Sequence, residues 1–244
     1  MSNSPALTGQ IVVVIGGSSG IGRQTARLAR AEGASIILAG RDPERLEHAA
    51  AELGALSTSA FDATDPAALR RFFTDLPGQI DHVMVTAGGQ YYAPLAEMDF
   101  EAASRALDEH LLLPLQVGRD AAGRVRPGGT LIFMTGTSAR RPGPGLAIAA
   151  IAAAAVPAIT ANLALEIAPV RVNLIAAGFV DTPLSARLLG DDLEERRRQL
   201  RATLPIRRVV GPDDVASLAV HLMTNTAVTG ATYDIDGGEQ FVAG

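Results

Sequence analysis

The stretch Ile11–Gly22 reads Ile-Val-Val-Val-Ile-Gly-Gly-Ser-Ser-Gly-Ile-Gly, an apolar run followed at once by glycines. A continuous apolar run is typical of a central strand in a parallel sheet, because both faces of such a strand are buried. The glycines permit a tight turn, and they let a pyrophosphate approach the N–H groups at the start of a helix. The stretch therefore predicts a strand, a dinucleotide-binding turn and a helix that begins near Gly20.

Short apolar runs alternate with helical stretches along the rest of the chain, which predicts an α/β Rossmann fold. Further strands are expected near 35–39, 57–61, 82–86, 130–135, 171–176 and 231–235, which gives a doubly wound seven-stranded parallel sheet flanked by helices. Asp42 and Asp65, each followed by proline, predict helix starts. We expect residues 1–244 to form a single domain, with 178–208 as an insertion on the substrate side.

Composition narrows the classes of partner and chemistry. The net charge is -5, so no nucleic-acid or membrane partner is expected. The chain has no cysteine, and its four histidines show no ligand spacing, so neither thiolate chemistry nor a metal is expected. Met1–Gln10 lacks the features of a signal peptide, and the longest apolar stretch, 145–159, is short for a bilayer span. A cytoplasmic protein is predicted.

The segment that ends the second expected strand reads Ala39-Gly40-Arg41. An acidic side chain at this place binds the ribose 2′-hydroxyl of NAD and repels a 2′-phosphate. Arg41 offers instead a planar guanidinium, which is well suited to phosphate. The sequence therefore predicts NADP(H) as the cofactor.

The spacing of Gly16, Gly20 and Gly22 resembles the Thr-Gly-x-x-x-Gly-x-Gly fingerprint of the short-chain dehydrogenase/reductase family, and the resemblance extends to Gly238. Thr86-Ala87-Gly88 is similar to the end of the family's Asn-Asn-Ala-Gly segment, and 176–182 is similar to its nicotinamide loop. The resemblance implies a homodimer or homotetramer. It also implies a set of cofactor-binding residues: Gly16, Ser18, Ser19, Gly20, Ile21, Gly22, Arg41, Asp62, Ala63, Ala87, Gly88, Gly178, Val180 and Thr182.

The catalytic residues of that family are missing. Its reaction depends on a Tyr-x-x-x-Lys pair, and this chain contains no lysine. Counted back from Leu163-Ala164-Leu165-Glu166, which resembles the end of the family's catalytic helix, the tyrosine and lysine positions fall on Ala149 and Ala153. The family's serine position falls on Gly136 and its asparagine position on His110. The usual proton donor and the ammonium that assists it are therefore both absent.

Other polar residues are candidates for acid–base work. His110 has an imidazole, which can donate or accept a proton, and Tyr91 and Tyr92 follow the Thr86–Gly89 turn. One hypothesis is an NADP(H)-binding oxidoreductase for an unknown small molecule that needs no strong proton donor, such as an iminium ion or a conjugated acceptor. The alternative is a catalytically inactive relative that serves as a cofactor-binding or interaction subunit. A third hypothesis is non-redox chemistry with the cofactor as a structural element.

Overall fold

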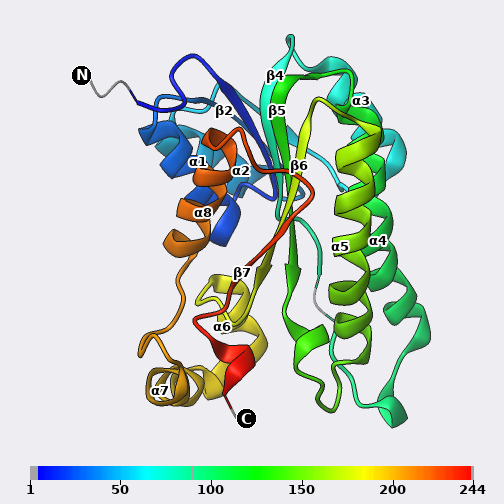
Figure 1. Cartoon of the computed structure of the whole chain (residues 1–244), viewed down its shortest axis with the longest axis vertical. Helices are drawn as coiled ribbons and strands as arrows, with labels where there is room; N and C mark the ends of the chain where they lie inside the picture. Colours follow the sequence, from blue (N-terminus) through cyan, green and yellow to red (C-terminus); the bar gives the residue numbers. More distant parts are fainter. Residues whose placement is uncertain (1–4, 90, 243–244) are drawn as a thin grey trace.

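Seven parallel strands form one sheet in the order β3-β2-β1-β4-β5-β6-β7 in the computed structural model, which describes residues 5–89 and 91–242 (Figure 1). The strands are β1 Ile11–Ile15, β2 Ser35–Gly40, β3 Ser57–Ala60, β4 Ile80–Val85, β5 Val125–Gly136, β6 Arg171–Ala177 and β7 Thr232–Ile235. The strand order reverses between β1 and β4, which is the switch point of a doubly wound sheet. The predicted Rossmann fold is confirmed.

Two layers of helices cover the sheet (Figure 1). One layer contains α1 Gly20–Ala31, α2 Pro43–Leu53 and α8 Pro212–Thr224, and the other contains α3 Pro66–Asp75, α4 Phe100–Ala121 and α5 Ala147–Glu166. Alternate residues of β1 serve the two cores: Val12 and Val14 pack towards the first layer, and Val13 and Ile15 towards the second. Both faces of this strand are buried, which explains its continuous apolar sequence.

Two of the helices begin where aspartate precedes proline. The Asp42 side chain accepts a hydrogen bond from the N–H of Arg45 at 3.1 Å at the start of α2. The Asp65 side chain accepts from the N–H groups of Ala67 and Ala68 at 2.8 and 3.2 Å at the start of α3. Both predicted helix starts are confirmed, since each carboxylate satisfies N–H groups that have no partner within the helix.

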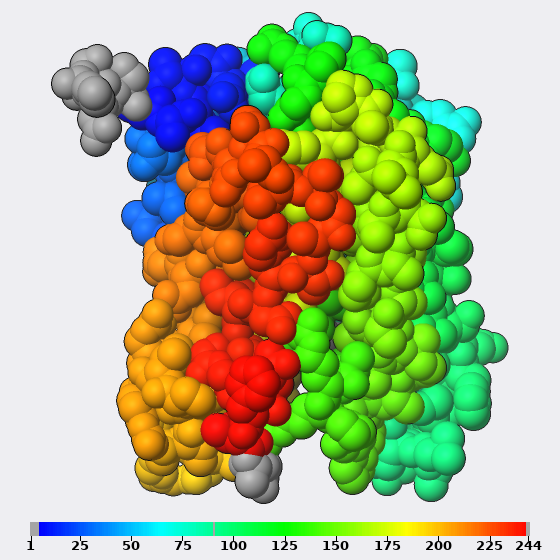
Figure 2. All heavy atoms as spheres, viewed as in Figure 1, coloured from blue at the N-terminus to red at the C-terminus, as the bar shows by residue number. Residues whose placement is uncertain are grey.

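Residues 178–208 lie between β6 and α8 and contain two further helices. These are α6 Pro183–Leu189 and α7 Leu193–Thr203, joined by a short 3-10 turn. The C-terminal residues, including the 3-10 turn Glu239–Phe241, pack beside them (Figure 2). This part of the chain lies beyond the carboxyl end of the sheet (Figure 1).

Helix α5 is longer than the apolar stretch that marks it in the sequence. It has 20 residues, and among the described residues it is the one helix that is long and apolar enough to cross a membrane by length and composition. The apolar stretch 145–159 covers only the first part of this helix, which continues past Pro157 to Glu166. Val156 and Leu163 pack into the core on the sheet, whereas Ile151 and Leu165 lie on the exposed side.

Candidate functional site

A cleft of about 920 Å³ lies at the carboxyl ends of β1, β4, β5 and β6. Its walls come from the start of α1, the facing helices α4 and α5, and the segment that contains α6 and α7. Ligands of doubly wound sheets bind in this position, at the switch point between the two halves of the sheet. The cleft is therefore the candidate functional site.

The glycine turn (Gly16–Gly22) forms one end of the cleft and leaves no room for a side chain at Gly16 or Gly22. The N–H groups of Gly16 and Gly17 both donate to the Ala39 carbonyl, at 2.8 and 3.1 Å. A Cβ atom on Gly22 would stand 2.3 Å from the Gly16 carbonyl oxygen and 2.6 Å from Thr86 Oγ1. Glycine is required here because the turn packs directly on α1 and on the residue after β4.

The first turn of α1 is open towards the cleft. Ser19 is the N-cap residue of this helix, and its side chain makes no capping hydrogen bond. The first N–H groups of a helix carry a partial positive charge and need acceptors. Ser19 and Gly20 both line the cleft, so these groups fit the pyrophosphate of a dinucleotide.

Most of the predicted cofactor-binding residues meet in this cleft. Those that line it are Gly16, Ser19, Gly20, Ile21, Gly22, Ala87, Gly88, Gly178, Val180 and Thr182. Ser18, Arg41, Asp62 and Ala63 are not part of the lining. Ser18 lies beside the end of β2, since a Cβ atom on Gly40 would be 3.6 Å from its Oγ.

Arg41 and Asp62 are polar residues on two loops just outside the cleft. The N–H and hydroxyl of Thr64 donate to Asp62 Oδ1 at 2.9 and 2.8 Å. The hydrogen bond from the Thr64 N–H lowers the pKa of Asp62, and its hydroxyl and the Arg41 charge act in the same direction. Arg41 is exposed and makes no ion pair with any described residue. Its guanidinium is thus available to a phosphate near the adenosine end.

The other end of the cleft contains two of the positions at which the sequence analysis expects the family's catalytic groups. Gly136 ends β5 and Ala149 lies on α5, and both line the cleft. Ala153 is 7% exposed and does not line it. A Cβ atom on Gly136 would meet nothing closer than Ser138 Oγ at 3.8 Å, so a side chain would fit there.

His110 projects from α4 into the cleft with a defined tautomer. Its Nδ1 lies 2.7 Å from the Ala106 carbonyl oxygen, one helical turn earlier. A carbonyl only accepts, so Nδ1 carries the proton. In the neutral ring Nε2 is then an acceptor, and in the protonated ring it is a donor. His110 can therefore bind either kind of polar atom in the cleft.

The two candidate tyrosines differ in what their hydroxyls do. The Tyr91 hydroxyl accepts from the Asp99 N–H at 2.7 Å and donates to the Asp99 carbonyl at 3.1 Å. Its proton is thus used to hold the loop against the start of α4. Tyr92 is 51% exposed and lines the cleft, and partial burial of its hydroxyl raises the pKa of that group. Tyr92 therefore stays protonated at neutral pH.

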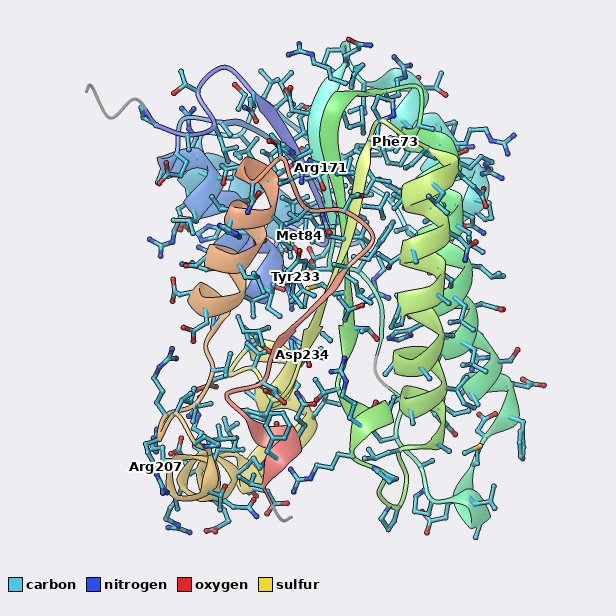
Figure 3. All side chains as sticks on the ribbon, viewed as in Figure 1. Phe73, Met84, Arg171, Arg207, Tyr233 and Asp234 are labelled. Atoms are coloured by element: carbon cyan, nitrogen blue, oxygen red, sulfur yellow. The ribbon has the colours of Figure 1, made fainter. Side chains whose placement is uncertain are left out.

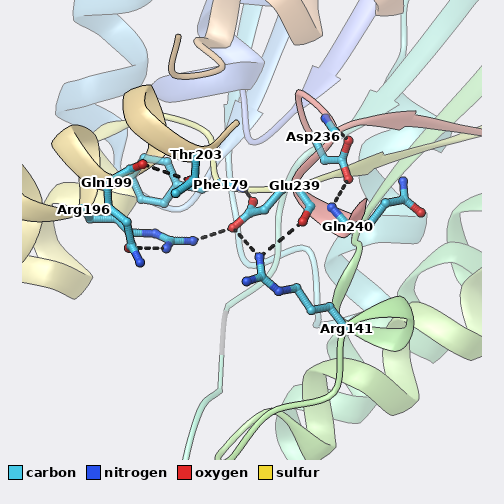
Figure 4. Close-up of polar contacts among 9 residues, drawn as sticks. Arg141, Phe179, Arg196, Gln199, Thr203, Asp236, Glu239 and Gln240 are labelled. Atoms are coloured by element: carbon cyan, nitrogen blue, oxygen red, sulfur yellow. Dashed lines mark hydrogen bonds and ion pairs between the residues drawn. The ribbon is translucent and has the colours of Figure 1, made fainter. Parts of the chain in front are cut away.

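Three charged residues, Arg141, Arg196 and Glu239, together close one wall of the cleft. Arg141 and Arg196 both form ion pairs with Oε1 of Glu239, with an N–O distance of 3.6 Å for Arg141 (Figure 4). Oε2 of Glu239 accepts from the N–H of Phe179 at 3.1 Å. The pairs join the C-terminal segment to α7 and to the loop before α5, so they shape the cleft.

Comparisons with known proteins agree with this architecture. Residues 15–240 match the family model described as "Enoyl-(Acyl carrier protein) reductase". The short-chain dehydrogenase/reductase ATR9 of Stachybotrys chlorohalonatus is 29% identical over an alignment that covers 96% of this chain and 98% of that protein. The chain therefore has relatives along nearly its whole length.

Solved structures are similar over the same range. The reductase/Diels-Alderase MalC of Malbranchea aurantiaca has a TM-score of 0.90 and 26% identity, with 97% of this chain and 98% of MalC covered. A small-chain dehydrogenase solved in complex with NADPH has a TM-score of 0.82 and 26% identity, with 95% and 99% of the two chains covered.

Proposed function

This chain belongs to the short-chain dehydrogenase/reductase family, and we propose that it is an NADP(H)-dependent oxidoreductase whose substrate needs no strong proton donor. One observation carries the proposal. The three glycines of the turn, Gly16, Gly20 and Gly22, line the same cleft as Gly136 and Ala149, which carry no polar side chain. The cleft thus keeps the means of binding a dinucleotide and has lost the groups that protonate a carbonyl oxygen.

The residues of the cleft fit NADP(H) at each part of the molecule. The glycine turn would hold the pyrophosphate, Arg41 the 2′-phosphate, and Val180 and Thr182 the nicotinamide end. When bound there, the cofactor supplies the hydride, whereas the protein orients and polarises the substrate. The similar structure solved with NADPH supports this choice of cofactor.

The proposed substrates are an iminium ion or a conjugated acceptor. An iminium carbon that gains a hydride becomes an amine carbon without any proton transfer, and a conjugated acceptor takes its proton at carbon, where water is a sufficient source. His110 and Tyr92 are proposed to orient such a substrate, since both line the cleft. MalC is described as both a reductase and a Diels-Alderase. A cycloaddition also proceeds without a proton donor, so that relative supports the proposal.

We infer the oligomeric state of the protein from the exposed face of the second helical layer. Ile151 and Leu165 on α5, and Leu112 and Leu115 on α4, are exposed apolar residues on neighbouring helices. Such a patch is typical of an interface, so we propose a homodimer or homotetramer in the cytoplasm, with residues 178–208 on the substrate side of the cleft.

Turnover tests the proposal. NADPH oxidation is followed by absorbance with cyclic iminium salts, enones and simple ketones as substrates. We expect consumption with one of the first two classes, little with ketones, and lower turnover in His110→Ala and Tyr92→Phe. Binding of NADPH without any turnover would instead show the alternative, a catalytically inactive relative that binds the cofactor.

A further inference from the structure

Thr135 is a buried threonine at the carboxyl end of β5, one residue before Gly136. It is 9% exposed and lines the cleft, yet its hydroxyl oxygen has no hydrogen-bond partner among the described residues. A buried hydroxyl without a partner lowers stability, so most buried hydroxyls in proteins are paired. At the wall of a cleft, such a group is suited to a ligand.

Strand geometry shows which way this hydroxyl points. Successive side chains of a strand point to opposite faces of the sheet. Leu131 and Phe133 share a face with Thr135, and both belong to the core that contains Leu113 of α4 and Val156 of α5. Thr135 therefore points towards α4 and α5, whereas the position of Gly136 faces the other way.

Apolar side chains line the cleft beside Thr135. Leu113, Phe133, Ala149 and Ala152 line it together with Thr135, and we call this group of five the inner bay. Ala149, at the position where the family's tyrosine is expected, contributes only a methyl group to it. The inner bay combines apolar walls with a single unpartnered hydroxyl.

We propose that the inner bay binds an unsaturated apolar ring of the substrate and that Thr135 Oγ1 makes the hydrogen bond to the ring's one polar atom. The inference rests on the proposed function and names the substrate class of that site. A hydroxyl both donates and accepts, so it can bind the N–H of a cyclic iminium ion or the oxygen of a cyclic enone.

A second polar group stands nearby on α4. His110 Nε2 reaches the cleft, and Pro114, which also lines it, has no N–H to donate to the His110 carbonyl one turn earlier. Both the Nε2 atom and the carbonyl oxygen of His110 can accept a hydrogen bond from an N–H group. His110 therefore adds acceptors to the polar groups that line the cleft.

The test measures binding as well as turnover. Two probes, 3,4-dihydroisoquinolinium and 2-cyclohexen-1-one, are titrated calorimetrically into the NADP+ complexes of the wild type, Thr135→Val and Thr135→Ser. We expect one of the two probes to bind the wild type. Thr135→Val should weaken the affinity for this probe about tenfold, and Thr135→Ser should retain that affinity. Ala149→Phe, which fills the inner bay, is expected to abolish binding of the probe and to leave the affinity for NADPH within about twofold.

A stability measurement separates this role from a structural one. Thr130, on the same strand, is fully buried, and its hydroxyl donates to the Arg171 carbonyl at 3.1 Å. Thr130→Val should lower the melting temperature, whereas Thr135→Val should leave it unchanged or raise it, because no bond is lost. Binding of neither probe to the wild type, or equal binding in Thr135→Val, would overturn the inference. Absence of NADPH turnover with probe binding that depends on Thr135 would overturn only the proposed function.

Discussion

The two ends of the cleft differ in what fixes their residues. At the cofactor end, the positions of Gly16 and Gly22 are set by close backbone contacts that exclude any side chain. At the reacting end, a Cβ atom on Gly136 would meet nothing closer than 3.8 Å, and Ala149 lines the cleft, so backbone contacts do not fix Gly136 in the same way. The glycines at the cofactor end therefore reflect its geometry, whereas we propose that the small residues at the reacting end reflect the chemistry of the site.

Restoring the missing groups gives the largest expected effect and tests the reacting end directly. The triple variant Gly136→Ser, Ala149→Tyr, Ala153→Lys should gain NADPH-dependent reduction of simple ketones, by about 10²–10⁴-fold over the wild type, because a positioned proton donor contributes that much. Gly136→Ser alone is the control, since it fits without a proton donor. Ketone reduction as slow as in the wild type, in a folded triple variant, would mean that these positions do not form a catalytic site.

Stability against pH tests a region remote from both ends. His82 of β4 is 3% exposed, and its Nε2 lies 2.6 Å from Gln10 Oε1. Burial lowers the pKa of His82 to about 4, and the positive charge of Arg171, at the amino end of β6, adds to the effect (Figure 3). In the unfolded chain His82 binds a proton below about pH 6.5, whereas in the folded chain it binds a proton only below about pH 4.

The contribution of neutral His82 to the free energy of unfolding should therefore be fully present above pH 6.5. The free energy of unfolding should fall by up to about 3 kcal/mol as the pH drops to 4. Urea unfolding at several pH values measures it. His82→Gln should flatten this dependence, and the exposed His221→Gln should keep it. Equal slopes in all three proteins would refute the role of His82. The result also defines the pH range in which binding to the two ends can be compared without unfolding.

A substitution in the glycine turn tests the cofactor end. Gly22→Ala should prevent NADPH binding and lower stability by about 1–3 kcal/mol, because the added Cβ atom meets the Gly16 carbonyl. The control is Gly123→Ala, where a Cβ atom would meet nothing within 4 Å. Calorimetric titration and thermal unfolding measure both quantities. If Gly22→Ala bound NADPH as the wild type does, the account of the glycine turn would be wrong.

The smallest expected effect concerns cofactor preference. Arg41→Ala should weaken NADPH binding about tenfold and leave NADH binding unchanged, since only the contact with the 2′-phosphate is lost. Arg45→Ala is the matched control, because Arg45 is exposed and is paired with Asp42 at 3.0 Å. Equal losses for both cofactors would place the role of Arg41 elsewhere.

The sequence predicted the features that depend on local contacts. The seven strands, the two aspartate caps and the glycine turn all follow from short segments whose physical requirements are local. Gly136 and Ala149, the positions expected to lack catalytic side chains, could also be located from the sequence. The spacing along one strand and one helix places them in the same cleft.

Features that depend on distant partners could not be predicted. The ion pairs of Glu239 with Arg141 and Arg196 join three separate parts of the chain. The absence of a partner for Thr135 is a property of its surroundings and leaves no pattern in the sequence. The use of the Tyr91 hydroxyl by Asp99 likewise depends on how the loop folds back on α4.

Fluorescence titration of the purified wild type with NADPH and with NADH tests the central claim most directly. The account predicts that NADPH binds at least about tenfold more tightly than NADH, since the glycine turn serves both and Arg41 adds a contact with the 2′-phosphate of NADPH alone. Failure of both cofactors to bind would contradict it.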